Sequence, residues 1–395
     1  MSNVNWAEES IKLHKKWKGK LAVKSKAPLK TKYDLSTAYT PGVAQPCLEI
    51  AKNKEAAYDY TWKRNSVVVL SNGTRVLGLG NIGALAGLPV MEGKAVLFKG
   101  FANIDAVPLC VNAYTVDELV AIGKAIAPTF GGINLEDISV PDCFEVEERL
   151  IAALDIPVFH DDQHGTAIVA LAALVNALKA TNRDIKTARI LCNGVGAAGS
   201  AILKAIYAAG ARNIIAFDSK SALSKNRPEL KGTYKEKLLP LVQEFNGSFE
   251  EGFVKADVFI GTSKPGIVTK QMISTMAKDS IVIALSNPVP EIMPEEAVAG
   301  GAKIVCTGRS DYPNQVNNVL AFPGVFRGAL DSKAKKITDG MKLAAANALA
   351  SIVSNEEIAS GIVVPSPFDK NVAKTIAKAV ARQAKKEKVT RNLSS

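Results

Sequence analysis

Two short segments concentrate carboxylate side chains next to apolar sequence. The segment "FHDDQHGTA" (159–167) places two adjacent aspartates before a long apolar stretch, and "INLEDISVP" (133–141) places a glutamate next to an aspartate. Neighbouring carboxylates repel each other and are costly to bury without a cation. Helix capping accounts for one aspartate but leaves the second segment unexplained. We therefore expect a divalent metal to bridge both segments, and oxygen ligands favour Mg²⁺ or Mn²⁺ over Zn²⁺.

A glycine-rich turn predicts a second kind of site. "NGVGAAG" (193–199) has the spacing G-x-G-x-x-G, follows an apolar strand and precedes a helix of small residues. Glycines here permit a tight turn and a close approach of a pyrophosphate to the helix N-terminus. The next strand ends nineteen residues later in an aspartate, where a carboxylate can bond a ribose hydroxyl. The predicted dinucleotide contacts are Gly194, Val195, Gly196, Ala197, Ala198, Gly199 and Asp218.

The choice between NAD⁺ and NADP⁺ depends on the residues around Asp218. Its carboxylate favours the free ribose diol of NAD⁺, because a negative charge repels a 2′-phosphate. The segment "DSKSALSKNR" also places hydroxyl and basic groups behind it that could bind that phosphate. These groups are Ser219, Lys220, Lys225 and Arg227. On balance the sequence favours NADP⁺, with NAD⁺ as the alternative.

A second match to the glycine spacing, "GLGNIG" (78–83), lies in a different setting. It overlaps the end of "SVVVLSNGTRVLGLG" (66–80), which we interpret as a β-hairpin with an Asn-Gly turn. No clear helix and no acid at the end of a later strand accompany this match. We expect a loop that needs the backbone freedom of glycine, not a phosphate site.

The elements that must position these segments fall into two groups. From about residue 158 to 310, apolar strands alternate with helical segments, which is typical of a parallel sheet covered on both faces. The expected strands are 188–194, 213–218, 256–262, 279–286 and 302–308. The expected fold class is α/β, with an N-terminal α/β substrate and catalytic domain (1–157) and a doubly wound Rossmann-type NAD(P)-binding domain (158–395). The latter ends in a helical tail, in which Asp369 is expected to cap a helix over 369–383.

Composition narrows the class of protein further. The chain of 395 residues has a formal charge of +11, but its basic residues are spread out except at 382–391, and aromatic residues are not interleaved with them. We therefore expect attraction of small anions and no nucleic-acid binding. No apolar run reaches the length of a membrane span, and the first twenty residues lack the apolar region of a secretory signal. The five scattered cysteines predict buried free thiols in a reducing compartment, the cytoplasm.

Seven motifs that occur in order give the chain a resemblance to a known family. They are "AYTPGVA" (38–44), "VLGLGNIG" (76–83), "GKAVLFK" (93–99), "LEDI" (135–138), "FHDDQHGTA" (159–167), "SNPVPE" (286–291) and "NNVLAFPG" (317–324). Together they resemble the malic enzymes, especially the short microbial type, over roughly residues 20–385. The resemblance implies oxidative decarboxylation of L-malate to pyruvate and CO₂ with reduction of NAD(P)⁺. It also implies a homodimer with chain ends at the interface.

The resemblance implies roles for the acidic and proton-transferring residues. It puts the lysine base at Lys94, although Lys99 is a competitor by position, and the tyrosine acid at Tyr39. Asp161 would orient that lysine or a metal-bound water. The implied metal ligands are Glu136, Asp137 and Asp162.

The same resemblance assigns the remaining contacts. Asn287 and Asn318 match residues at the nicotinamide and the substrate, and we prefer Asn318 to the adjacent Asn317. Arg75 falls where larger relatives carry an arginine for the substrate carboxylate. The family pattern puts neither histidine of the "HDDQH" segment on the metal. Both are expected to cap a helix or to form hydrogen bonds near the site.

The implied chemistry needs these residue types. Removal of hydride from C2 of malate needs a base for the hydroxyl proton, and a lysine can serve if burial and nearby cations lower its pKa. A metal on the C2 oxygen helps oxaloacetate to lose CO₂, and a tyrosine can then protonate enolpyruvate at C3. Two alternatives are an amino-acid or methylenetetrahydrofolate dehydrogenase, which needs no such metal set, and a non-enzymatic sensor that binds NAD(P) and a partner.

Overall fold

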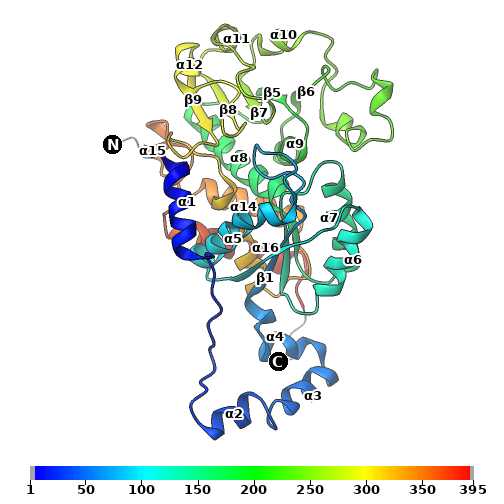
Figure 1. Cartoon of the computed structure of the whole chain (residues 1–395). Coiled ribbons are helices and arrows are strands. Elements are labelled where there is room, and N and C mark those ends of the chain that lie inside the picture. The colour runs from blue at the N-terminus through cyan, green and yellow to red at the C-terminus, as the bar shows by residue number, and fades with distance from the viewer. Residues whose placement is uncertain (1–4, 392–395) are drawn as a thin grey trace.

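The computed structural model describes residues 5–391 and is built around two parallel β-sheets (Figure 1). The first sheet has the strand order β2-β1-β3-β4, and the second has the order β6-β5-β7-β8-β9. The strands are β1 (Ser66–Ser71), β2 (Asp105–Cys110), β3 (Gly132–Leu135), β4 (Val158–His160), β5 (Arg189–Asn193), β6 (Asn213–Phe217), β7 (Val258–Gly261), β8 (Ser280–Ala284) and β9 (Ala302–Thr307). The expected α/β class with a parallel nucleotide-binding sheet is confirmed.

Helices connect and cover these strands on both sides (Figure 1). Sixteen α-helices are assigned within residues 5–391. They are α1 (Trp6–Trp17), α2 (Lys32–Ala38), α3 (Ala44–Lys52), α4 (Ala57–Tyr60), α5 (Gly83–Ala102), α6 (Val116–Ile126), α7 (Asp142–Ala153), α8 (Asp161–Ala180), α9 (Ala197–Ala208), α10 (Phe249–Phe253), α11 (Lys270–Ser274), α12 (Pro294–Ala299), α13 (Phe322–Asp331), α14 (Asp339–Ala350), α15 (Asn355–Ala359) and α16 (Asn371–Lys386).

The second sheet contains all five strands that the sequence predicts after residue 188, with ends shifted by a few residues. Strand β5 lies between β6 and β7, so the chain leaves β5 toward one side of the sheet and later returns on the other. This reversal leaves a crevice outside the carboxyl ends of the strands, which is where doubly wound folds bind ligands.

The predicted hairpin over residues 66–80 is wrong. Strand β1 is buried along its whole length and pairs in parallel with β2 on one side and β3 on the other, so both of its edges are already occupied. The Asn-Gly pair ends the strand instead. Gly73 adopts a positive φ of 67°, and its carbonyl accepts the N–H groups of Ile82 and Gly83. Contrary to expectation, a clear helix, α5, therefore follows the "GLGNIG" loop.

The C-terminal helices pack against the first sheet's helices and are not an appended tail. An aromatic cluster joins Phe98 of α5 to Phe322 and Phe326 of α13, with ring centroids 4.7 and 5.4 Å apart. Phe159 of β4 contacts the same Phe326 ring at 5.7 Å. Helix α8, most of whose residues are buried, runs from the end of β4 toward the second sheet. One hydrophobic core therefore extends through both parts of the chain.

The boundary between the two predicted domains can be compared with the positions of the sheets. Strand β4 pairs with β3, so the change from the first sheet to the second falls between His160 and Arg189. A domain boundary after residue 157 remains a prediction. In the last helix, Val372, Ile376 and Val380 are buried as expected for one face.

The cap of that last helix differs from the prediction. Helix α16 begins two residues later than expected, with Lys370 at the N-cap position and no side-chain cap bond. Asp369 instead accepts the backbone N–H of Asn371 at 2.8 Å.

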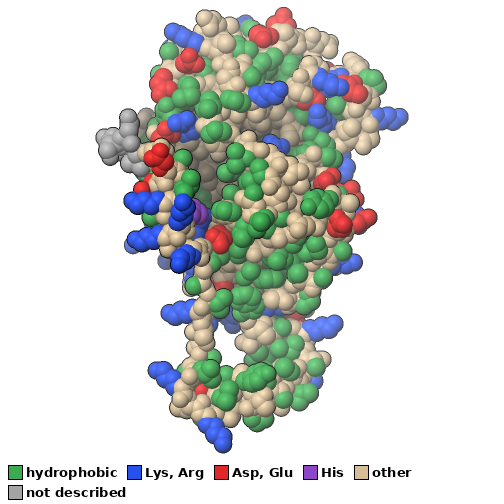
Figure 2. Space-filling view, viewed as in Figure 1, with side chains coloured by type: hydrophobic (Ala, Val, Ile, Leu, Met, Phe, Trp, Pro, Cys, Tyr) green, Lys and Arg blue, Asp and Glu red, His purple; other side chains and the backbone are tan. Residues whose placement is uncertain are grey.

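An arm formed by residues 20–60 projects from the body and carries α2 and α3 (Figure 1). Hydrophobic side chains gather on its surface (Figure 2). The exposed large hydrophobic side chains of the arm are Leu21, Val23, Leu29, Tyr33, Leu35, Tyr39, Val43, Leu48 and Tyr60. No other part of the described chain covers these side chains.

The cysteines are free, as predicted, but not all are buried. Cys143, Cys192 and Cys306 are buried, whereas Cys110 is half-buried and Cys47 lies exposed on the arm. The prediction of burial is therefore wrong for Cys47, because α3 has no buried residue. Within residues 5–391, none of the helices combines the length and apolarity needed to cross a membrane.

Candidate active site

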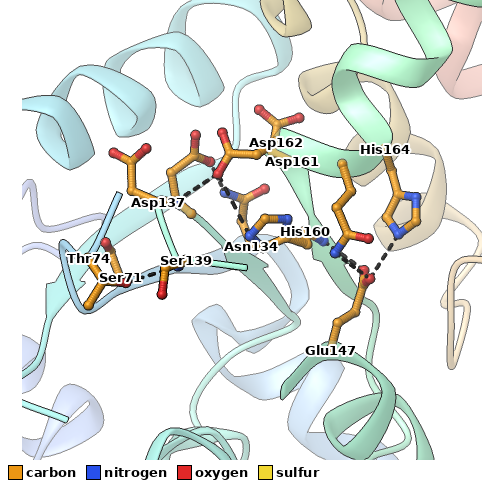
Figure 3. Close-up of polar contacts among 12 residues, drawn as sticks. Ser71, Thr74, Asn134, Asp137, Ser139, Glu147, His160, Asp161, Asp162 and His164 are labelled. Carbon is orange, nitrogen blue, oxygen red and sulfur yellow. Dashed lines mark hydrogen bonds and ion pairs between the residues drawn. The ribbon is translucent and has the colours of Figure 1, made fainter. Parts of the chain in front are cut away.

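The two carboxylate segments meet at the carboxyl edge of the first sheet (Figure 3). Leu135 of β3 pairs with His160 of β4, so the residues that follow, Glu136 and Asp161, leave adjacent strands at the same edge. Glu136, Asp137 and Asp162 each place one carboxylate oxygen within 4.8 Å of the others. The structure thus brings together the three residues expected to bind a metal.

Asp137 and Asp162 are also linked through the backbone. The N–H group of Asp137 donates to Oδ2 of Asp162 at 2.9 Å. Asp137 holds a positive φ of 52°, a conformation that costs a non-glycine residue about 1 kcal/mol or more and is often found at functional sites. The bond between the two segments helps to offset that cost and fixes their spacing.

Burial makes this group of carboxylates difficult to ionise together. Desolvation raises the pKa of Glu136 well above its ordinary range, and that of Asp137 to about 7. Oδ2 of Asp137 and Oδ1 of Asp161 are buried without a hydrogen-bond partner within residues 5–391. Unpaired carboxylate oxygens and an all-oxygen donor set fit a hard divalent cation, so the residues present suit Mg²⁺ or Mn²⁺.

Lys94 of α5 reaches into this cluster. Its Nζ lies 2.6 Å from Oδ2 of Asp161 and 2.9 Å from Oε1 of Glu136, and 4.4 Å from the ring centroid of Phe322. Burial alone would lower the pKa of Lys94, but the charges of Asp161 and Glu136 outweigh it and hold the pKa above its ordinary value. Lys94 is therefore protonated while both carboxylates carry charge. The competing lysine, Lys99, is exposed and pairs with Asp105.

Glu147 of α7 is a buried residue at this site that the sequence did not single out. Its Oε1 accepts the backbone N–H of His160 at 2.8 Å, and its Oε2 lies 3.2 Å from Nε2 of Gln163 and 2.9 Å from Nε2 of His164 (Figure 3). Burial would raise the pKa of Glu147, but His164 outweighs it and lowers the pKa to about 2. An ionised Glu147 thus anchors the start of α8.

The two histidines lie beside the cluster but do not belong to it. Nε2 of His164 bonds Oε2 of Glu147. His160 takes the N-cap position of α8 without a side-chain cap bond. Both ring nitrogens of His160 are buried without a hydrogen-bond partner in the described chain, and Nε2 lies 3.7 Å from Oδ2 of Asp162.

The predicted glycine turn has the shape that dinucleotide binding needs. Gly194 adopts a positive φ of 94°, and a Cβ there would lie 2.7 Å from the carbonyl oxygen of Thr262. A Cβ on Gly199 would overlap the carbonyl oxygen of Gly194. Gly196 takes the N-cap position of α9 with no side chain between the helix and the crevice. Any larger residue at Gly194 or Gly199 would force the strand and helix apart.

The adjoining cleft has a volume of about 680 Å³, within the range of ligand sites. It is lined by the turn at 193–196, by residues 217–221, and by residues that the sequence analysis missed, notably Tyr234, Lys235, Ser263 and Lys264. The sequence offered no signal for the latter, because they follow other strands or lie in irregular segments.

Asp218 lies in this cleft and is held by two cations. Arg227 forms a bidentate pair with its oxygens at 3.0 and 3.1 Å, and Nζ of Lys235 lies 2.6 Å from Oδ2. Oδ1 also accepts the N–H groups of Lys220 and Ser221. Burial raises the pKa of Asp218, but the bonds from Arg227 and Lys235 outweigh it and hold the pKa well below its ordinary range.

Arg75 lies between the two parts of the site. Its backbone N–H donates to the carbonyl oxygen of Asp137 at 3.1 Å. A Cβ on Gly196 would lie 3.8 Å from Nη1 of Arg75, so its guanidinium faces the dinucleotide turn. Arg75 therefore bonds Asp137 through its backbone, and its guanidinium lies near the glycine turn.

The two asparagines lie on loops that reach the same region. A Cβ on Gly78 would lie 3.2 Å from the carbonyl oxygen of Asn287, so the "GLGNIG" loop packs on the "SNPVPE" loop. Asn318 lies against the first turns of α8, because a Cβ on Gly165 would be 2.9 Å from its Cβ. Buried Glu291 accepts the N–H groups of Ser263 and Ser286 at 2.7 and 3.0 Å, which ties the loops after β7 and β8 together.

Tyr39 is the one expected catalytic residue that the structure does not bring to the cluster. It caps the C-terminal end of α2 and is 67% exposed. Helix α2 lies on the arm, remote from α5 and α8 (Figure 1).

Fold and site together define a class, the oxidoreductases that hold a nicotinamide dinucleotide on a Rossmann-type domain. Family models give the particular family. The model described as malic enzyme, N-terminal domain, matches residues 18–116, and that described as malic enzyme, NAD binding domain, matches residues 163–385. The chain belongs to the malic enzyme family, and the resemblance drawn from its motifs is confirmed.

Individual relatives agree over nearly the whole chain. A bifunctional malic/malolactic enzyme of Bacillus subtilis is 53% identical, covering 97% of this chain and 94% of the relative. An NAD-dependent malic enzyme of Geobacillus stearothermophilus is 50% identical, covering 94% and 78%. The crystal structure of a malic enzyme from Pyrococcus horikoshii is 48% identical and has a TM-score of 0.91 over 98% of this chain and 93% of that one.

Proposed function

We propose that this protein oxidatively decarboxylates L-malate to pyruvate and CO₂ while reducing NAD(P)⁺, with Mg²⁺ or Mn²⁺ held by Glu136, Asp137 and Asp162. The observation that carries the proposal is the contact of buried Lys94 with Asp161 and Glu136 inside the carboxylate cluster. A positioned amine beside a cation site is what removal of an alcohol proton requires. The names of the relatives support the same reaction.

The proposed reaction has three steps, which are oxidation at C2, loss of CO₂ and protonation at C3. The C2 hydroxyl proton passes to Lys94 as hydride leaves C2 for the nicotinamide. The C3–C4 bond then breaks, CO₂ leaves, and the electron pair of that bond remains in the enolate of pyruvate. Tyr39 gives its proton to C3, and the proton that Lys94 took from the hydroxyl replaces it, which restores both groups. When bound, the metal supplies the positive charge that stabilises the developing negative charge on the C2 oxygen.

Lys94 needs a lower pKa to act as the base, and its burial can supply that shift. Two carboxylates raise the pKa of Lys94, while burial opposes them. Once the carboxylate charge is offset by a cation, burial becomes the larger effect and favours the neutral amine. Asp161 keeps Nζ in place through its 2.6 Å contact.

Substrate contacts are proposed for Arg75, Asn287 and Asn318. The guanidinium of Arg75 faces the gap between the carboxylate cluster and the glycine turn, where it can pair with a carboxylate of malate. Asn287 and Asn318 belong to the loops that border that gap.

The proposed acid, Tyr39, can reach the site only from another copy of the chain. It is exposed at the end of α2 on the apolar arm, and in this chain the arm lies away from Lys94 (Figure 1). We propose a homodimer in which each arm packs on the partner and supplies Tyr39 to the partner's Lys94.

For the cofactor, we propose that both dinucleotides bind and that NADP⁺ is preferred. The carboxylate of Asp218 favours NAD⁺, but Arg227 and Lys235 surround it with two positive charges. Ser219 and Lys220 also line the cleft. The net local charge is therefore positive where a 2′-phosphate would lie. A preference for NAD⁺ above about tenfold in kcat/KM would contradict this proposal.

The experiment that tests the function is a steady-state assay with L-malate, NAD⁺ or NADP⁺, and Mn²⁺ or EDTA. EDTA should abolish turnover and Mn²⁺ or Mg²⁺ should restore it. Asp162→Asn should lose Mn²⁺ affinity by about tenfold or more, measured by calorimetry, since it removes a charged ligand. Glu356→Gln, on exposed helix α15, is the matched control. Full activity in thoroughly demetallated protein would refute the metal role.

A further inference from the structure

A partly open cavity lies outside both sites described above, between α8, α9 and α14. Its volume is about 110 Å³. Its floor consists of small and aliphatic side chains, chiefly Ala167, Ile168, Leu171, Ala201, Ala205 and Ala346. An apolar cavity of this kind is costly to leave empty and binds apolar groups readily.

The rim of the cavity carries two lysines, Lys204 and Lys342, and one carboxylate, Asp339, so its net charge is positive. Lys204 of α9 is exposed at the rim and has no ion pair or hydrogen bond to any other residue of the described chain. Lys342 of α14 pairs with Asp339 at 3.0 Å, but the side chain of Asp339 is 94% exposed. Lys342 itself is only 19% exposed, but solvent around Asp339 screens the pair, so an anion in the cavity can bind both ammonium groups beside it.

His164, also at the rim, does not satisfy Lys342. Its Nε2 lies 2.9 Å from Oε2 of Glu147 and 3.4 Å from Nζ of Lys342. The contact with Lys342 is the longer of the two, so Nε2 of His164 bonds chiefly to Glu147. Nζ of Lys342 therefore has donors left for a further anion.

We propose that this cavity binds a small monocarboxylate with a short branched apolar tail, with its carboxylate between Lys204 and Lys342. The volume suits a tail of about four to six carbons, since a cavity of about 150 Å³ takes benzene. A neutral hydrocarbon would leave both ammonium groups unpaired. A dicarboxylate such as malate would place its second charge against the alanine floor, which is unfavourable.

The cavity is separate from the catalytic groups. Gln163, His164 and Leu171 line it from one face of α8, whereas Asp162 lies on the opposite face, because successive residues turn by about 100°. A ligand in the cavity therefore does not compete with malate for the carboxylate cluster.

The test uses the full chain and 4-methylpentanoate as the probe, with binding measured by calorimetry. We expect a Kd on the order of 1 mM, unchanged by saturating L-malate. Acetate, which lacks the tail, and 4-methylpentanamide, which lacks the charge, should each bind at least about tenfold more weakly.

Two variants locate the binding. Lys204→Gln should weaken it about tenfold, and Ala205→Leu should abolish it by filling the cavity, with circular dichroism to verify folding. Lys186→Gln, a change at an exposed lysine after α8, should leave it unchanged. Absence of binding to the wild type, binding unaffected by Lys204→Gln, or displacement by L-malate would each overturn the proposal. None of these outcomes depends on turnover.

Discussion

Asp161 and Gly165 share one space at the start of α8: a Cβ on Gly165 would overlap Oδ1 of the Asp161 carboxylate. The two residues are one helical turn apart and therefore face each other. The other oxygen of Asp161 contacts Nζ of Lys94 at 2.6 Å. The absence of a side chain at Gly165 thus sets the position of Asp161, and through it that of Lys94.

Gly165→Ala should therefore reduce kcat by about 10²-fold, the cost of a displacement of about 1 Å among reacting groups. Thermal unfolding should still be cooperative, because Ala is a better helix former than Gly. Gly100→Ala in α5, where no atom lies within 4 Å of the added Cβ, is the control and should keep wild-type kcat. A fully active Gly165→Ala enzyme would mean that the position of the Asp161 carboxylate does not depend on the space at Gly165.

Glu147→Gln should destabilise the protein in a pH-dependent way. The pKa of Glu147 is lowered to about 2, so its carboxylate contributes stability above its unfolded pKa and loses it as pH falls through the folded value. The contribution is about 3 kcal/mol near neutral pH. The difference in unfolding free energy between wild type and variant, from urea titration without metal, should shrink from about pH 7 to about pH 3.

The exposed residue Glu356 provides the comparison for Glu147. Glu356→Gln should change the unfolding free energy by less than about 0.5 kcal/mol at either pH. If the Glu147→Gln difference stays constant with pH, the carboxylate charge is not what anchors α8.

Lys235→Met should shift cofactor preference. Lys235 lies 2.6 Å from Asp218, and its loss removes a positive charge beside the ribose site while Arg227 still holds the aspartate. We expect kcat/KM for NADP⁺ to fall about tenfold more than that for NAD⁺, the scale of one charge-assisted hydrogen bond to phosphate. Lys231→Met, at an exposed neighbour, should alter neither ratio. Equal losses with both cofactors would remove Lys235 from phosphate recognition.

Subunit mixing tests whether Tyr39 acts across a dimer. Tyr39→Phe and Lys94→Ala proteins, each nearly inactive, are mixed, dissociated and reassociated. If Tyr39 serves the partner's Lys94, every heterodimer has one intact site, and activity returns to about a quarter of the wild-type value. If both residues act within one chain, mixing restores nothing.

The sequence predicted the second sheet well, because strands buried on both faces read as continuous apolar runs. The same property caused the error at β1: a fully buried strand followed by Asn-Gly resembles the first half of a hairpin. Only the long-range pairing with β2 and β3 distinguishes a buried parallel strand from the first strand of a hairpin. Local patterns contain no information about which strands lie on either side.

The residues of the candidate site also fall into two groups, those that the sequence indicated and those that it did not. Adjacent acids such as Glu136 and Asp137 were visible because burying like charges has an evident cost. Glu147 and Lys235 were not, because each is an ordinary charged residue until the fold places it beside His164 or Asp218. Tyr39 was predicted from its motif, whereas its position on an exposed arm depends on geometry that no motif contains.

The aromatic contacts of Phe98 and Phe159 with α13 have a consequence for synthesis on the ribosome. Residues near 98 and 159 emerge long before Phe322 and Phe326, which cover them in the finished protein. Until the last quarter of the chain emerges, the first sheet's helices expose apolar surface, a condition that favours aggregation. The nascent chain therefore needs either rapid completion or a chaperone that covers this surface until α13 arrives.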